Sequence, residues 1–264
     1  MFFPLMKTHE LDGFLDLLNS PPNNWENPLK KKTYIYLIWL NEDKWESRLL
    51  FSLEPNEYRR LTSLEFPDEI GEWGVVFVYP SHTKIPEFLS ELPSKKYWYG
   101  QFPAWRCTSG FFNKFAQVSY QSDLEPLPEK ASLLTFHPFI QYKEIDNYLI
   151  VLNLNKKPIR KEGLLHMYES SSYSKKGTTR IFTNALTTIP LDQFNFEHNE
   201  LPVFYSPDIP GIPFGLGIKK DKTMLSLEHT HPPASLVLFG DRRSAQGIIK
   251  KEWIRRLEPS VENE

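Results

Sequence analysis

Two histidines separated by one residue are the side chains in this sequence whose types and spacing best suit chemistry. His229 and His231 lie at the end of a strand-like run over residues 223–229. Residues two apart on a strand project to the same side, so both imidazoles are placed to bind one metal ion such as zinc. A zinc site needs at least one further ligand. We rank His166 first for this role, followed by Asp241, His137 and Asp208.

The same pair of histidines has two other interpretations. Histidine titrates near neutral pH, so His229 and His231 could act as general acid and base without a metal. Glu228 points to the opposite face of a regular strand, and becomes a candidate base only if the strand ends early. Three arginines could then bind an anionic substrate: Arg180, Arg242 and Arg243. Alternatively, both histidines are structural, at the end of a strand that the two following prolines terminate.

The quartet from His229 to Pro232 (HTHP) resembles the histidine core of the JAMM family of zinc isopeptidases. The resemblance covers four residues and implies a pair of zinc-bound histidines. That family continues with a serine and an aspartate, and Phe239 and Arg242 occupy these positions here. Because the family's third ligand and oxyanion donor have no counterpart, the sequence does not indicate membership.

Composition argues against several classes of protein. The formal net charge is −2 at pH 7, which gives no reason to expect nucleic acid or an acidic membrane as partner. Aromatic residues make up 14% of the chain, so bulky rings should supply much of the core. The single cysteine, Cys107, cannot form an internal disulfide, which indicates a reducing compartment and a structural thiol.

The length of 264 residues suits one large or two small domains. No apolar run approaches the roughly 20 residues of a membrane span. The first residues also lack the features of a secretory signal. We therefore expect a cytoplasmic protein.

The first half of the chain is predicted to mix helices and strands. Apolar residues recur at helical spacing over residues 9–19, which predicts an amphipathic helix. Residues 33–40 and 44–53 are predicted to pair as a hairpin, and residues 74–79 to form another buried strand. Short helices are predicted to begin near two prolines, Pro55 and Pro86. This order of elements indicates an α+β fold with a mixed α/β N-terminal half.

Residues 97–115 hold eight aromatic residues, with Arg106 and Lys114 among them. Interleaved rings and cations can stack on single-stranded bases. The same composition also suits an aromatic-rich core with its bordering turns. We favour the core, because the run contains only two cations.

The second half is predicted to be mainly antiparallel sheet. Strands at hairpin spacing are predicted over residues 132–137, 148–154, 164–170, 178–186, 202–206, 215–219 and 223–229. The proline-containing segment 124–130 is the best candidate boundary. It separates a mixed lobe at 1–128 from a β lobe at 129–264, which are either separate domains or two lobes of one compact domain. We find no fixed-period internal repeat.

A C-terminal helix capped by Asp241 is predicted to close the second lobe. One broad face of this helix is apolar and consists of Ala245, Ile248, Ile249, Trp253 and Leu257. The opposite face is basic and consists of Arg243, Lys250, Lys251 and Arg255. Such a face is either a solvated surface or a contact surface for an acidic partner.

For function, we expect a binding or interaction module whose histidines are structural. The alternative is an enzyme, such as a hydrolase that depends on a divalent metal like zinc. Its catalytic residues would be His229, His231 and Glu228, and its metal ligands would be His229, His231 and His166. The sequence names neither the substrate nor the partner.

Overall fold

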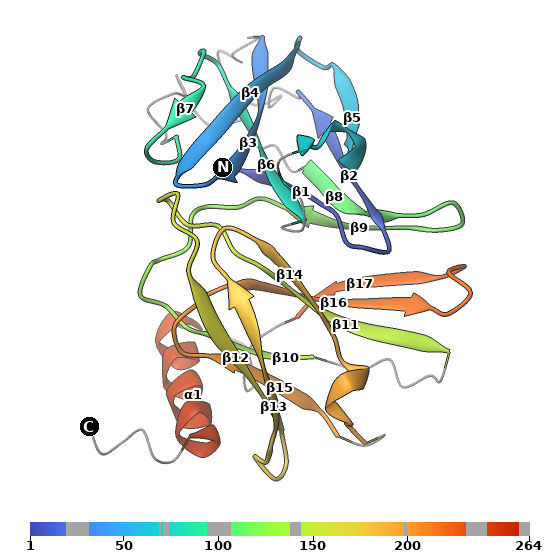
Figure 1. The fold of residues 1–264 in the computed structure, drawn as a ribbon, viewed down its shortest axis with the longest axis vertical. Coiled ribbons are helices and arrows are strands. Elements are labelled where there is room, and N and C mark those ends of the chain that lie inside the picture. The colour runs from blue at the N-terminus through green and yellow to red at the C-terminus, as the bar shows by residue number, and fades with distance from the viewer. Residues whose placement is uncertain are drawn as a thin grey trace. The chain divides into compact units, whose positions relative to one another are not determined.

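The computed structural model describes residues 1–19, 32–68, 70, 74–93, 107–137, 144–197, 200–230 and 242–258. Within these residues the chain forms seventeen β-strands and one α-helix (Figure 1). The only α-helix of the described residues is C-terminal, so the predicted α+β fold with a mixed α/β N-terminal half is wrong. The described chain is mainly antiparallel β. No helix in it is long and apolar enough to cross a membrane.

The chain divides into two compact units, each of which contains two sheets. Unit 1 comprises Met1–Leu127, Leu154–Arg160 and Thr183–Leu186. Unit 2 comprises Pro128–Asn153, Lys161–Phe182 and Thr187–Glu264. Two short segments from the later part of the chain therefore belong to the first unit.

In unit 1 the two sheets have the strand orders β1-β6-β3-β4-β7 and β5-β2-β8-β9. The first contains β1 (Phe3–Met6), β6 (Val75–Ser81), β3 (Thr33–Asn41), β4 (Lys44–Leu53) and β7 (Phe88–Leu89). The second contains β5 (Tyr58–Thr62), β2 (Asp12–Leu18), β8 (Cys107–Phe112) and β9 (Gln117–Ser122).

In unit 2 the two sheets have the strand orders β10-β15-β12-β13 and β14-β11-β16-β17. The first contains β10 (Leu133–Phe136), β15 (Pro202–Ser206), β12 (Glu162–Glu169) and β13 (Lys175–Phe182). The second contains β14 (Leu186–Pro190), β11 (Ile145–Leu152), β16 (Ile212–Lys219) and β17 (Leu225–His229). The helix α1 (Arg242–Leu257) follows.

The two units repeat one strand arrangement. If β7 is set aside, the eight strands of each unit follow the chain in the same order and occupy the same places in the two sheets. A short 3₁₀ turn also follows the fifth strand in both, at Ser63–Glu65 and at Asp192–Phe194. The sequence shows no fixed-period repeat, because a sheet requires only the alternation of inward and outward residues and not their identities.

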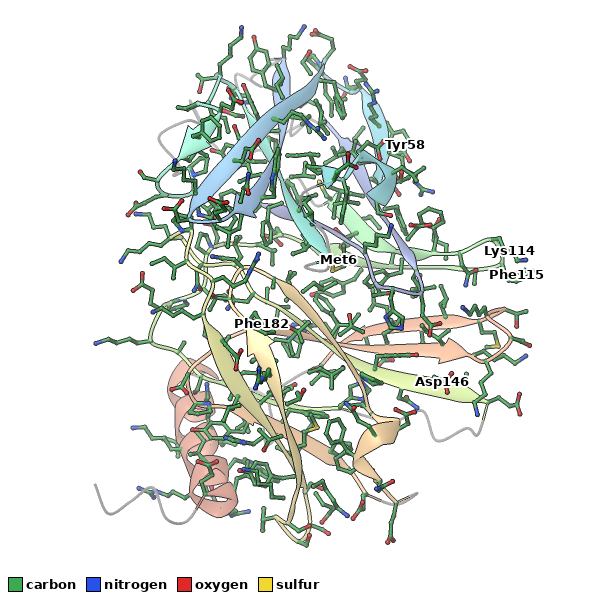
Figure 2. The ribbon with its side chains drawn as sticks, in the orientation of Figure 1. Met6, Tyr58, Lys114, Phe115, Asp146 and Phe182 are labelled. Atoms are coloured by element: carbon green, nitrogen blue, oxygen red, sulfur yellow. The ribbon has the colours of Figure 1, made fainter. Side chains whose placement is uncertain are left out.

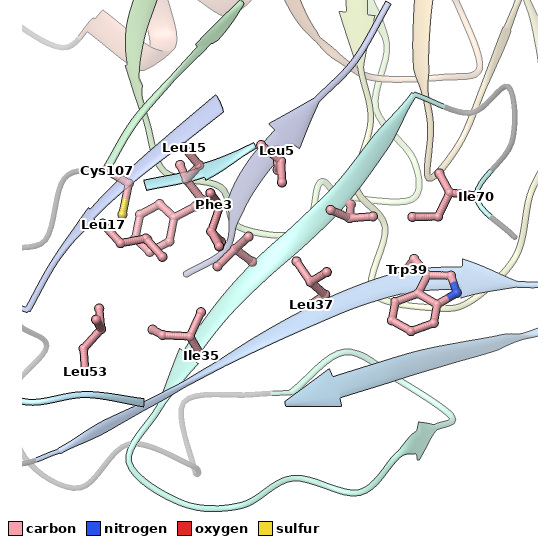
Figure 3. Packing of buried hydrophobic residues seen from close by; sticks show 13 residues of the cluster. Phe3, Leu5, Leu15, Leu17, Ile35, Leu37, Trp39, Leu53, Ile70 and Cys107 are labelled. Atoms are coloured by element: carbon pink, nitrogen blue, oxygen red, sulfur yellow. The ribbon is translucent and has the colours of Figure 1, made fainter. Parts of the chain in front are cut away.

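The core of each unit lies between its two sheets. In unit 1, Phe3, Ile35 and Leu37 from one sheet meet Leu15 and Leu17 from the other (Figure 3). Unit 2 has a corresponding core, to which residues of β10, β12, β13 and β15 contribute from one sheet and residues of β11 and β14 from the other. Each unit is therefore a two-layered β-sandwich, stabilised mainly by the burial of apolar surface.

The predicted helix at residues 9–19 is instead the strand β2. Leu15 and Leu17 on one side of β2 lie in the core, and Phe14 on the other side is also fully buried. The Phe14 ring lies over Gly110, where an added Cβ would come within 2.7 Å of it. Because Phe14 and Leu18 add apolar residues on the face opposite Leu15 and Leu17, the pattern of β2 imitates that of a short helix.

The helices predicted near Pro55 and Pro86 are also wrong. The first segment forms β5, which pairs with β2, and the second forms β7, which pairs with Trp45 and Glu46 of β4. The predicted hairpin of residues 33–53 and the strand near 74–79 are confirmed as β3, β4 and β6. Six of the seven strands predicted in the second half are also confirmed, whereas the predicted strand 178–186 ends at Phe182 as β13 and a turn separates it from β14, which was not predicted. Residues 97–106 of the aromatic run lie outside the described residues.

Candidate functional site

The residues that the sequence marks for chemistry do not converge in the described part of the chain. His229 is the last residue of β17 and lies opposite Phe214 of β16, with the two ring centroids 5.7 Å apart. Glu228 lies opposite Gly215, so it points to the other face of the sheet. His231 lies outside the described residues.

His166 lies in the other sheet of unit 2, on β12. Its Nδ1 is 3.1 Å from Thr178 Oγ1, and its Nε2 is 3.8 Å from Glu258 Oε1. His137 is buried, and its Nε2 lies 3.1 Å from the carbonyl oxygen of Tyr148. The rings of His166 and His137 therefore contact different residues.

The prediction of metal binding is wrong for the described residues. They contain no group of three or more His, Cys, Asp or Glu side chains that could hold a metal ion. The first-ranked third ligand, His166, lies in a different sheet from His229, and its neighbours Leu165 and Met167 face the core between the sheets, so His166 faces away from the sheet of β17. Asp241, another candidate, lies outside the described residues.

Cys107 behaves as the structural thiol that its sequence context indicates. Its side chain is buried in the core of unit 1. Burial raises the pKa of Cys107 well above its usual range, and the charges of Asp123 and Asp16 add to this. The thiol is therefore protonated at neutral pH and is a poor nucleophile.

Connected polar side chains also lie where α1 meets the sheet of β12. Trp253, Ile254 and Leu257 of the helix form an apolar cluster with residues of β10, β12 and β15. The rings of Trp253 and Phe136 meet edge to face at 5.1 Å. At the end of the helix, the Tyr168 hydroxyl donates a hydrogen bond of 2.8 Å to Glu258 Oε1.

The protonation states at this junction follow from burial. Burial lowers the pKa of His166, and Lys175 lowers it further, although Glu258 and Asp208 oppose the shift. His166 is therefore uncharged at neutral pH. Burial also raises the pKa of Tyr168, with Glu258 as the next cause. Tyr168 thus keeps its proton and remains a donor to Glu258.

The substitution Tyr168→Phe tests whether this hydrogen bond holds the end of α1. We expect the free energy of unfolding to fall by about 1–2 kcal/mol, as for other hydrogen bonds to charged acceptors. Urea denaturation at neutral pH measures the loss. In the matched control, Glu258→Gln keeps an acceptor oxygen and should cost less. Unchanged stability in Tyr168→Phe would contradict the anchoring role.

The rotation of α1 differs from the predicted one at two positions. Ile248, which was predicted to lie on the apolar face, is 67% exposed. Lys250, which was predicted to lie on the basic face, turns toward the sheet and donates a hydrogen bond of 2.6 Å to the Ser132 carbonyl oxygen. Burial lowers the pKa of Lys250. The long stem of lysine lets its ammonium group reach a polar partner at the edge of an apolar contact.

The solvent side of α1 carries cations around an exposed apolar residue. We call Ile248, Lys251, Arg255 and Arg256 the basic side of α1; all four are exposed. Arg256 forms an ion pair with Glu252 and donates a hydrogen bond of 2.9 Å to the Tyr173 hydroxyl. Its guanidinium group is therefore held in place. The side chain of Arg243 is not described.

Comparison of the chain with protein-family models, with curated proteins and with solved structures finds no match. Function must therefore be argued from the residues themselves.

Proposed function

We propose that this chain is an interaction module that binds an acidic protein segment through the basic side of α1. The observation that supports this proposal is the exposure of three cations around an exposed isoleucine on a helix whose other side is anchored to a sheet. Glu252 is the only acidic side chain described among them, and Arg256 already neutralises it. Lys251 and Arg255 carry the other two positive charges of this side of the helix.

Such a surface combines the two contributions that protein recognition requires. Cations steer an acidic partner to the surface and discriminate against basic ones. An apolar side chain that becomes desolvated at the centre of the contact contributes to affinity. Ile248 lies three residues before Lys251 and seven before Arg255, so the three share one side of the helix.

A fluorescent peptide of alternating glutamate and leucine residues tests the proposal. We expect the intact chain to bind it with an affinity that weakens as salt increases, because exposed charges are screened. The double variant Lys251→Glu and Arg255→Glu should weaken binding by at least about tenfold, which corresponds to about 1.4 kcal/mol. Fluorescence anisotropy measures both effects.

The matched control is the double variant Lys220→Glu and Lys222→Glu, which makes the same charge change at the exposed turn between β16 and β17. This variant should bind the peptide as the parent does. Equal weakening by the control would show that net charge alone is responsible, which contradicts a defined surface. Tighter binding of a single-stranded oligonucleotide than of the peptide would reassign the surface to nucleic acid.

A further inference from the structure

The strand β9 of unit 1 lies at the edge of its sheet with one side of its backbone unpaired by any described strand. All six residues of β9 pair with β8 in one continuous register, from Gln117 opposite Phe112 to Ser122 opposite Cys107. Gln117, Ser119 and Gln121 are exposed. No described strand pairs with this edge of β9, which is therefore a regular row of backbone donors and acceptors.

Three other edge strands of the described residues carry protection that this edge lacks. The sequence of β9, QVSYQS, contains no charged residue and no proline. In contrast, β13 carries Lys175, Lys176 and Arg180 beside a register shift, and β5 carries Arg59 and Arg60. The equivalent edge in unit 2, β17, ends in a glutamate and a histidine. Proteins use charge, proline and bulges to prevent edges from pairing, so an uncharged regular edge indicates a strand that pairs.

We propose that β9 pairs antiparallel with β9 of a second copy of this chain, so that two four-stranded sheets join into one across a twofold axis. Outward residues must lie opposite outward residues in such a pair. A register centred on Ser119 satisfies this rule, because it places Gln117 opposite Gln121 and Val118 opposite Tyr120 of the partner copy. Amides can hydrogen-bond across the pair, and a β-branched residue facing an aromatic one is a favourable cross-strand pair.

The two ends of β9 are complementary to each other. Lys114 precedes the strand and Asp123 follows it, and both are exposed. They lie at opposite ends of β9, so a chain by itself does not bring them together. Antiparallel pairing brings Lys114 of each copy near Asp123 of the other. A symmetric contact of this kind is self-complementary and closes at two copies.

An exposed ring beside Lys114 supports the same contact. Phe115 is 57% exposed at the turn between β8 and β9, and its ring centroid is 4.6 Å from Lys114 Nζ. Figure 2 shows both side chains at the outer end of this hairpin. In the proposed dimer, Phe115 lies beside the end of the partner's strand and loses contact with water. One strand pair and two hairpin tips fall short of the roughly 1,200 Å² of a stable interface, so we expect a concentration-dependent dimer.

Sedimentation velocity over a wide range of protein concentration tests this proposal. We expect the parent chain to shift from monomer to dimer as concentration rises. Ser119→Lys places two ammonium groups opposite each other and should weaken the dimer at least about tenfold. Ser226→Lys is the matched control. Ser226 of β17 lies opposite Gly217 of β16, just as Ser119 of β9 lies opposite Gly110 of β8. Circular dichroism checks that both variants remain folded.

A charge exchange tests the register independently. Lys114→Glu and Asp123→Lys should each weaken the dimer, and the double variant should restore it. A parent chain that stays monomeric at every concentration overturns the proposal, as does a dimer that Ser119→Lys leaves intact. A double variant no better than the single ones overturns the antiparallel register. None of these measurements depends on the acidic peptide, so the two proposals fail separately.

Discussion

Replacing Trp45 with alanine is expected to lower the free energy of unfolding by about 4 kcal/mol, the typical cost of removing a fully buried tryptophan. Trp45 is 0% exposed on β4. The ring centroids of Trp45 and Phe77 of β6 lie 6.1 Å apart in an edge-to-face arrangement. Such a pair stabilises the fold beyond the contribution of buried apolar area. The alanine variant would leave a cavity that the surrounding strands fill only in part.

Trp45 also fastens a segment from later in the chain onto unit 1. Its Nε1 donates a hydrogen bond of 3.0 Å to the carbonyl oxygen of Lys156, which also accepts one from the backbone N–H of Leu92. Lys156 belongs to the segment Leu154–Arg160 that forms part of unit 1. The tryptophan therefore contributes both to the core and to the attachment of this segment.

Urea denaturation followed by circular dichroism measures the loss in Trp45→Ala. The control Trp45→Phe keeps an aromatic ring but removes the N–H donor, and should cost about half as much or less because Leu92 still satisfies the carbonyl. A loss below about 1 kcal/mol in Trp45→Ala would contradict the central role of this ring.

Replacing Glu169 with glutamine is expected to lower the free energy of unfolding by about 2 kcal/mol at neutral pH. Glu169 ends β12 and is 4% exposed. Its carboxylate accepts hydrogen bonds from the backbone N–H groups of Ser171 and Ser172, at 2.8 and 2.6 Å. The Ser171 hydroxyl donates a further bond of 2.8 Å. Glutamine replaces one of the two acceptor oxygens by an NH₂ group, which cannot accept the hydrogen bonds that these donors make.

The Glu169 effect should depend on pH in a defined direction. Burial disfavours the charged carboxylate, but the hydrogen bonds from Ser171 and Ser172 outweigh it and lower the pKa of Glu169 from 4.5 to about 2. A lowered pKa in the folded state stabilises the protein above pH 4.5, and this contribution is lost as the pH falls from 4.5 through 2. The difference between the parent chain and Glu169→Gln should shrink over the same interval.

Denaturation curves at neutral pH and at successively lower pH measure this difference. Glu162→Gln on the same strand is the matched control, because that side chain is 46% exposed and pairs only with Arg180 among the residues described. It should change stability by less than about 0.5 kcal/mol. A pH-independent loss in Glu169→Gln would contradict the assignment of the effect to the charged carboxylate.

The first half of the chain illustrates why local pattern misled the prediction of fold class. The segment that forms β2 has apolar residues on both faces, and such a short run cannot be distinguished by periodicity from a helix. Its partners are β5 and β8, which lie far along the sequence. The strands of the second half alternate clearly with polar turns, and these were predicted correctly except that β13 and β14 were not separated.

The histidines illustrate the same limit for the candidate site. The spacing of His229 and His231 is local, so the sequence could propose a pair of ligands. Whether His166 approached them depended on which strands share a sheet, and β12 and β17 do not. The anchoring of α1 by Tyr168 and Glu258 also joins residues that are distant in the sequence, and no motif marks it.

By itself, the sequence determined the strand-forming runs of the second half, the hairpin of β3 and β4, the C-terminal helix and the inert character of Cys107. These follow from local composition, turns and the absence of activating groups. Only the tertiary structure decided the repeat of one strand arrangement in two units, the rotation that exposes Ile248 and turns Lys250 toward Ser132, and the unprotected edge of β9. Each of these features depends on contacts between elements that are distant in the sequence. The local sequence of a strand or helix does not determine which other element packs against it.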